Sequence, residues 1–174
     1  GEALAAREGL GEFVAIVPAA AVDQVVDVGA VGTFGVTEHA QRGGLEVAAV
    51  LRLMRERVLA MREIWTKEEA TFHGTYVNFD AIWSWPKPAR KAGPPVILGG
   101  ETDYTLQRVV EYCDGWFPRT RAGFDAPQAI ARLSRMAEEK GRDPKTLSVT
   151  VFGAPNDAAA LEGYARAGIH SALL

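Results

Sequence analysis

The run GGET at residues 99–102 has the residue types and spacing of an anion-binding turn. It follows a short apolar run, residues 96–98, which predicts a strand buried on both faces. Thr102 is a suitable N-cap for the helix that should follow, and Thr105 lies one turn further on. At such a junction the unpaired backbone N–H groups and the helix dipole point the same way and favour a negative charge. We therefore predict a phosphate-binding turn here.

An alternative interpretation of the same residues needs no ligand. Glycine also supplies unusual backbone angles at plain strand-to-helix turns, and Thr102 can cap a helix without binding anything. If a phosphate does bind, we expect the backbone of Glu101 to contact it rather than the carboxylate, because two negative charges repel.

A second candidate group follows the next expected strand. A turn at residues 114–115 precedes the apolar pair at 116–117, so Trp116, Pro118 and Arg119 should lie at the rim beside the first turn. Arg119 and Arg121 suit phosphate or carboxylate groups, because a guanidinium binds such groups through two parallel hydrogen bonds. Exposed loop arginines without a ligand are the alternative.

The rest of the chain supplies a regular framework. After an amphipathic helix at 45–66 and an insertion at 67–94, strands and helices alternate: a strand at 96–98, a helix after Thr102, a strand at 116–117, a helix after Asp125, a strand at 147–152, a helix capped by Asn156 or Asp157 and closed by Gly168, and a strand at 169–174. Such alternation predicts an α/β fold with parallel strands. Periodicity alone does not separate a barrel from an open doubly wound sheet.

Two regions carry weaker signals. In the insertion, alternation at 75–79 predicts a hairpin leg, and a buried apolar plug is the simplest role for Trp83 and Trp85. Before residue 45, short strands are expected at 12–17 and 22–28, and the glycine-rich piece that contains His39 has no clear period.

Composition narrows the functional classes. The 174 residues, 48% apolar and 24% charged, suit one domain or a large piece of a bigger protein. A net charge of −3 does not favour nucleic acid or an anionic membrane, and no run approaches the roughly 18–20 apolar residues of a membrane span. A single cysteine, Cys113, excludes an internal disulfide, favours a cytoplasmic protein and suits a buried structural thiol. The three histidines lack metal-ligand spacing.

Six sequence fragments follow one another along the chain: FHGTYVNF, WPKP, PPVILGG, LQRVVEYCDGWFP, GRDP and AGIHSALL. Together they resemble the second half of the bacterial luciferase-like monooxygenase superfamily, nearest to its branch dependent on the deazaflavin coenzyme F420. The resemblance covers about residues 48–174. It implies a (β/α)8 TIM barrel, here incomplete and comprising roughly the C-terminal half, because a closed barrel needs about 250 residues. We accordingly divide the chain into an unassigned segment, 1–45, and a partial barrel, 46–174, and interpret the final uncovered strand as truncation.

The resemblance also implies a function. It implies an oxidoreductase that transfers hydride between F420, or alternatively FMN, and a small organic substrate, and that forms a homo-oligomer. The catalytic residues would come from early strands outside this chain, so none is named. The implied cofactor-binding residues are Gly99, Gly100, Glu101, Thr102, Thr105, Trp116, Pro118 and Arg119.

Two other functions remain open. One is a non-catalytic half-barrel that oligomerises through its open strand edges or binds cofactor weakly. A weaker one is a non-redox barrel enzyme that uses the same turn for a phosphorylated substrate.

Overall fold

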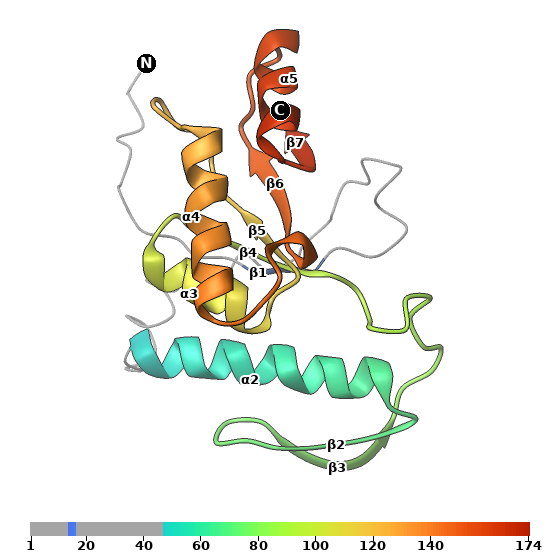
Figure 1. Ribbon diagram of the computed structural model, residues 1–174. Helices are drawn as coiled ribbons and strands as arrows, with labels where there is room; N and C mark the ends of the chain where they lie inside the picture. Colours follow the sequence, from blue (N-terminus) through green and yellow to red (C-terminus); the bar gives the residue numbers. More distant parts are fainter. Residues whose placement is uncertain (1–13, 17–46) are drawn as a thin grey trace, which may run out of the picture.

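The computed structural model describes residues 14–16 and 47–174, with side chains from residue 48 onward (Figure 1). Residues 22–28 and His39, discussed above, lie outside this part. In chain order the described elements are β1 (Val14–Ile16), α2 (Val47–Thr66), β2 (Glu69–His73), β3 (Asn78–Trp83), β4 (Val96–Gly99), α3 (Asp103–Tyr112), β5 (Gly115–Phe117), α4 (Ala126–Glu139), the 3₁₀ helix η2 (Pro144–Thr146), β6 (Ser148–Phe152), α5 (Ala158–Ala167) and β7 (Ser171–Leu173).

The main sheet has the strand order β1-β4-β5-β6-β7. Strands β4 to β7 are parallel and consecutive, and α3, α4 and α5 connect them. This confirms the expected α/β fold, and four parallel strands are half of the strands of a (β/α)8 barrel. The predicted strand at 12–17 is present as β1, which pairs with β4 in the antiparallel sense.

The hydrophobic core lies on one face of this sheet, which α3, α4 and α5 cover (Figure 1). Leu98 and Trp116 are neighbours in register on that face, and both are almost fully buried. Burying a side chain of this kind stabilises the fold by about 1.5–3 kcal/mol. Side chains on the opposite face, such as Phe117 and Phe152, are only partly buried or exposed.

The helix boundaries follow the expected caps. The Oγ1 of Thr102 accepts the N–H of Thr105 at 3.1 Å, and the carboxylate of Asp125 accepts the N–H of Gln128 at 2.9 Å. Asp157, rather than Asn156, caps α5. Gly168 ends α5 with a φ of 92°, a left-handed conformation that glycine adopts without strain.

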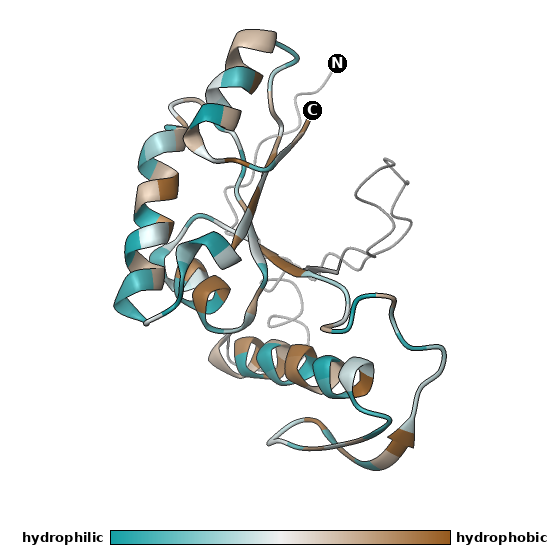
Figure 2. Ribbon diagram, turned by 45° about the vertical axis from the view of Figure 1, so that its right-hand side comes forward, coloured by the Kyte–Doolittle hydropathy of each residue, from teal (hydrophilic) through white to brown (hydrophobic). Residues whose placement is uncertain are grey.

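Helix α2 lies between the β2–β3 hairpin and the rest of the described chain, with apolar and polar residues alternating along it (Figures 1 and 2). Its Glu56 carboxylate accepts the backbone N–H groups of Thr75, Tyr76 and Val77 at 2.7–3.0 Å. Desolvation acts to raise the pKa of Glu56, but these three hydrogen bonds outweigh it, and the pKa is lowered. Glu56 thus fastens the hairpin turn to α2.

The interpretation of Trp83 and Trp85 as a buried plug is wrong, since they are 74% and 67% exposed. The less exposed positions of the hairpin hold Ala70, Phe72, Phe79 and Ile82. Trp83 lies on the exposed side, where its indole N–H donates to Glu69 at 3.2 Å. The Lys87 ammonium lies 5.8 Å from the Trp85 ring centroid.

Candidate functional site

The β4–α3 turn has a backbone that only glycine adopts readily. Gly100 has a φ of 119°, and α3 begins three residues later. The carbonyl oxygen of Gly100 accepts the indole N–H of Trp116 at 2.7 Å, and that of Glu101 accepts the Arg132 Nη1 at 3.0 Å. Side-chain donors from β5 and α4 therefore hydrogen-bond both carbonyl oxygens. These bonds reduce the repulsion between the carbonyl oxygens and an anion at this turn.

Two threonines complete the start of α3. The Oγ1 atoms of Thr102 and Thr105 lie 2.8 Å apart, so the hydroxyl groups share a hydrogen bond. Thr105 is fully buried, whereas Thr102 is half-buried. The capping hydroxyl of Thr102 is thus the more accessible of the two.

Glu101 and Arg119 form a two-pronged ion pair at the turn. The Nε and Nη2 of Arg119 donate to the two carboxylate oxygens at 3.0 and 2.8 Å, and its backbone N–H donates at 3.2 Å. The side-chain hydrogen bond from Arg119 lowers the pKa of Glu101 despite its partial desolvation. The same bond raises the pKa of Arg119. The carboxylate is therefore neutralised within the chain, so Glu101 repels an anion less than its charge alone suggests.

The other predicted site residues lie at the same rim. Pro118 is fully buried directly after β5, and Trp116 is 2% exposed. Arg121 is exposed, and its backbone N–H donates to the carbonyl of Arg119 at 3.1 Å. The structure thus brings all eight predicted residues together at the carboxyl ends of β4 and β5.

Sequence reasoning missed Arg132 and the bond from the Trp116 indole to the turn. Besides holding the Glu101 carbonyl, Arg132 Nε donates to Asp103 at 2.8 Å, which ties α4 to the first turn of α3. One signal was available: Arg132 adjoins the buried stripe of α4, and Asp103 is the acidic residue in the first turn of the preceding helix.

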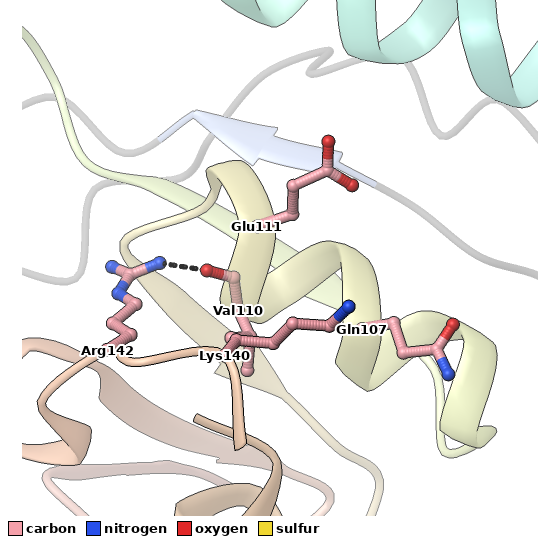
Figure 3. A pocket seen from close by; sticks show the side chains of 5 residues that line it. All are labelled: Gln107, Val110, Glu111, Lys140 and Arg142. Carbon is pink, nitrogen blue, oxygen red and sulfur yellow. Dashed lines mark hydrogen bonds between the residues drawn. The ribbon is translucent and has the colours of Figure 1, made fainter. Parts of the chain in front are cut away.

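A shallow polar pocket lies elsewhere, beside the C-terminal end of α3 (Figure 3). There the Arg142 Nη1 donates to the carbonyls of Val110 at 2.8 Å and Val109 at 3.3 Å. Arg142 thus acts as a cap for the last carbonyls of α3. This pocket is separate from the turn at residues 99–102.

The histidines and the cysteine in the described residues have structural contacts. His73 pairs with Asp80 at 2.8 Å on the exposed face of the hairpin, and His170 Nδ1 accepts the N–H of Val149 at 3.1 Å. Burial, and secondarily the nearby Asp114, raises the pKa of the Cys113 thiol to about 12.

Within residues 14–16 and 47–174 no histidine, cysteine and carboxylate side chains gather as a metal site. None of the helices in this part has both the length and the apolar character needed to cross a bilayer.

Solved structures share the fold. The chain aligns with an F420-dependent secondary alcohol dehydrogenase with a TM-score of 0.56 and 16% identity, covering 78% of this chain and 59% of that one. DmoA from Hyphomicrobium sulfonivorans gives a TM-score of 0.53 at 14% identity, covering 75% and 35%.

Sequence relatives are more similar but much longer. An uncharacterised protein of Mycobacterium tuberculosis is 30% identical over 106 residues, which cover 60% of this chain and 37% of the relative. The F420-dependent hydroxymycolic acid dehydrogenase of the same organism is 29% identical, with 53% and 25% covered. Pyrimidine monooxygenase RutA of Allorhizobium ampelinum is 32% identical, with 51% and 24% covered. The matches thus span between 24% and 37% of these relatives.

The family model described as luciferase-like monooxygenase matches residues 26–172. The matched region holds both halves of the candidate site, β4, β5, β6 and the start of β7. It also includes residues 26–45 of the segment left unassigned above. On this match, the chain belongs to the luciferase-like monooxygenase family.

Proposed function

We propose that this chain holds the phosphate-bearing end of a deazaflavin or flavin cofactor at residues 99–102, as part of an oxidoreductase that acts on a small organic substrate. F420 is the first choice and FMN the alternative, because one sequence relative and one solved structure named for F420 match the chain, as does one monooxygenase. The observation that carries the proposal is the β4–α3 turn, with its Gly100 backbone and its two restrained carbonyls.

The residues present fit a phosphate. Gly100 has no side chain to hinder close approach, Thr102 offers a hydroxyl, and the N-terminus of α3 offers backbone donors and a favourable dipole. The charge of Glu101 is matched by Arg119. Arg121 is exposed on the loop after β5 and can add a positive charge.

Each of these groups has a part in binding. Trp116 and Arg132 hold the turn in place before a ligand binds, so less conformational entropy is lost on binding. The cofactor itself supplies the hydride chemistry. The chain's own residues hold its anionic end and thereby orient the rest of it.

The test is a titration of the purified chain with F420 and with FMN, followed by fluorescence. We expect saturable binding of one of them, and we expect Gly100→Asp to weaken it at least about tenfold, which is about 1.4 kcal/mol. The new carboxylate would repel the phosphate, and its Cβ would strain the backbone at a φ of 119°.

Gly141→Asp is the matched control, because Gly141 also has a positive φ, 71°, and lies in open space after α4. It introduces the same charge away from the turn, at a φ in the left-handed region that aspartate tolerates, and should leave the affinity unchanged. If Gly100→Asp bound as tightly as the unmodified chain, the assignment of the phosphate to this turn would be wrong. If neither cofactor bound, the proposed function itself would fail for this chain.

A further inference from the structure

The turn of the β2–β3 hairpin directs three successive backbone N–H groups at one carboxylate. The N–H of Thr75 donates to Glu56 Oε1 at 2.9 Å, and those of Tyr76 and Val77 donate to Glu56 Oε2 at 2.7 and 3.0 Å. Successive N–H groups that converge in a turn form a concave binding site for an anion. In this chain the occupant of that site comes from helix α2.

Gly74 leaves the space that the carboxylate fills. A Cβ at this position would lie 2.3 Å from Glu56 Oε2, 2.7 Å from Glu56 Cδ and 2.9 Å from the Phe72 ring, so a side chain here would displace the carboxylate. Gly74 is not one of the glycines with a positive φ, so its backbone angle would accept another residue. The space that the anion needs therefore explains the glycine better than the backbone does.

The turn is held in shape by contacts that do not involve Glu56. Its ends are joined by the Gly74 N–H, which donates to the carbonyl of Val77 at 2.9 Å, and β2 and β3 pair up to the residues on either side. Beyond the hairpin, the Lys87 ammonium donates to the carbonyl of Ile64 at 2.7 Å and attaches the chain to the end of α2. Removing the carboxylate should thus leave a formed but empty site.

We propose that this turn is a carboxylate-binding site, which Glu56 occupies in the native chain and which a small free carboxylate can occupy in its place. Backbone N–H groups recognise the carboxylate group itself and not the chain that carries it. One oxygen accepts from Thr75 and the other from Tyr76 and Val77, a division that suits a group with two oxygens better than a halide ion. This inference does not rest on the proposed cofactor.

The first test is the thermal stability of Glu56→Ala in sodium formate and in sodium chloride at equal ionic strength. We expect the substitution to lower the unfolding midpoint by at least about 2 °C. Formate should raise the midpoint again, by more than chloride does, because a ligand that binds only the folded chain stabilises it as the site fills. If Glu56→Ala does not fold in buffer, we expect it to refold in formate but not in chloride.

Glu56→Gln is the matched control. Its amide keeps the site filled but removes the charge, so this variant should also lose stability, yet it should gain no more from formate than the unmodified chain does. The comparison separates occupation of the site from any general effect of formate on folding.

The second test observes the turn directly, in amide NMR spectra. The amide protons of Tyr76 and Val77 should move upfield in Glu56→Ala, because a hydrogen bond to a charged acceptor is stronger than one to water. Added formate should return them toward their native positions with saturation, whereas those of Glu56→Gln should not respond. Gly74→Ala should cause the same upfield shift without formate, since its Cβ displaces the carboxylate.

Four results would overturn the proposal: no advantage of formate over chloride for Glu56→Ala, an equal response of Glu56→Gln to formate, amide signals of Tyr76 and Val77 that formate does not move in Glu56→Ala, or failure of Glu56→Ala to fold in either salt.

Discussion

Glu101 is an acidic residue inside a turn whose other features favour an anion. Arg119 reconciles the two, because it binds the carboxylate with two side-chain hydrogen bonds and one backbone hydrogen bond. The side chains of Arg119 and Glu101 are only 29% and 32% exposed, so water screens the pair less than a typical surface ion pair. The pair therefore both stabilises the rim and sets its local charge.

The lowered pKa of Glu101 predicts a pH dependence of stability. A carboxylate with a depressed folded-state pKa contributes stability above its unfolded pKa, near 4.5, and loses it as the pH falls through the lower folded value. Glu101→Gln should therefore cost about 1 kcal/mol near neutral pH, and the difference from the unmodified chain should shrink toward zero in acid. Chemical denaturation at a series of pH values would measure it.

Comparing the two proteins at each pH cancels the titration of every other carboxylate. A difference that stays constant from neutral pH into acid would show that Glu101 acts through packing rather than through its charge.

Single residue types predicted only part of this site. The glycines, the Thr102 cap and the position after a buried strand are local features, and the structure confirms the local geometry that they predict. The contacts of Glu101 with Arg119 and of Gly100 with Trp116 join residues 18 and 16 positions apart. They depend on the register of β4 against β5, which no local pattern encodes.

At the scale of elements, Asp114 attaches α2 to the sheet. Its Oδ2 accepts the Arg62 Nη2 at 2.8 Å and the N–H of Val96 at 2.7 Å. Arg62 also donates to the carbonyl of Tyr112, at the end of α3. A turn residue expected only to lead into β5 thus links three elements at the amino-terminal ends of the strands, where a barrel's conserved contacts serve stability.

Asp114→Asn should lower the free energy of unfolding by about 1–2 kcal/mol, because it removes the charge that binds Arg62 and weakens the acceptor for Val96. Urea denaturation would measure the change. Glu111→Gln is a suitable control: its partner Arg55 makes a similar 2.7 Å contact, but the pair is about half exposed and should change stability by less than about 0.5 kcal/mol. Equal effects of the two substitutions would contradict the role given to Asp114.

The hairpin shows where pattern reading fails at this scale. Alternation at 75–79 correctly indicated a hairpin but placed the leg too early, because residues 75–77 lie in the turn and β3 runs from Asn78 to Trp83. Alternation does not say which face of the hairpin meets α2, so it could not place Trp83 on the exposed side. The Glu56 contact with three successive N–H groups could not be read from the sequence, because it depends on how the hairpin turn meets α2.

At the scale of the molecule, the order of strands and helices along the chain predicted more of the fold than any single motif. The succession of strands and helices from residue 96 correctly predicted four parallel strands, because βα units with short connections restrict the topology strongly. The antiparallel pairing of β1 with β4 was not predictable from local pattern, since an isolated apolar run does not encode the direction in which it pairs.

Cys113 offers a probe of the whole folded unit, because it lies in the core at the end of α3 and is 1% exposed. Burial raises the pKa of this thiol to about 12, so the reactive thiolate is a very minor form near pH 8. We expect an aromatic disulfide reagent to label the native chain negligibly and to label it fully in denaturant. The labelled fraction should follow the loss of helical circular dichroism with the same midpoint, since core residues are exposed only by global unfolding. Labelling well below that midpoint would instead show that the end of α3 opens separately from the rest of the core.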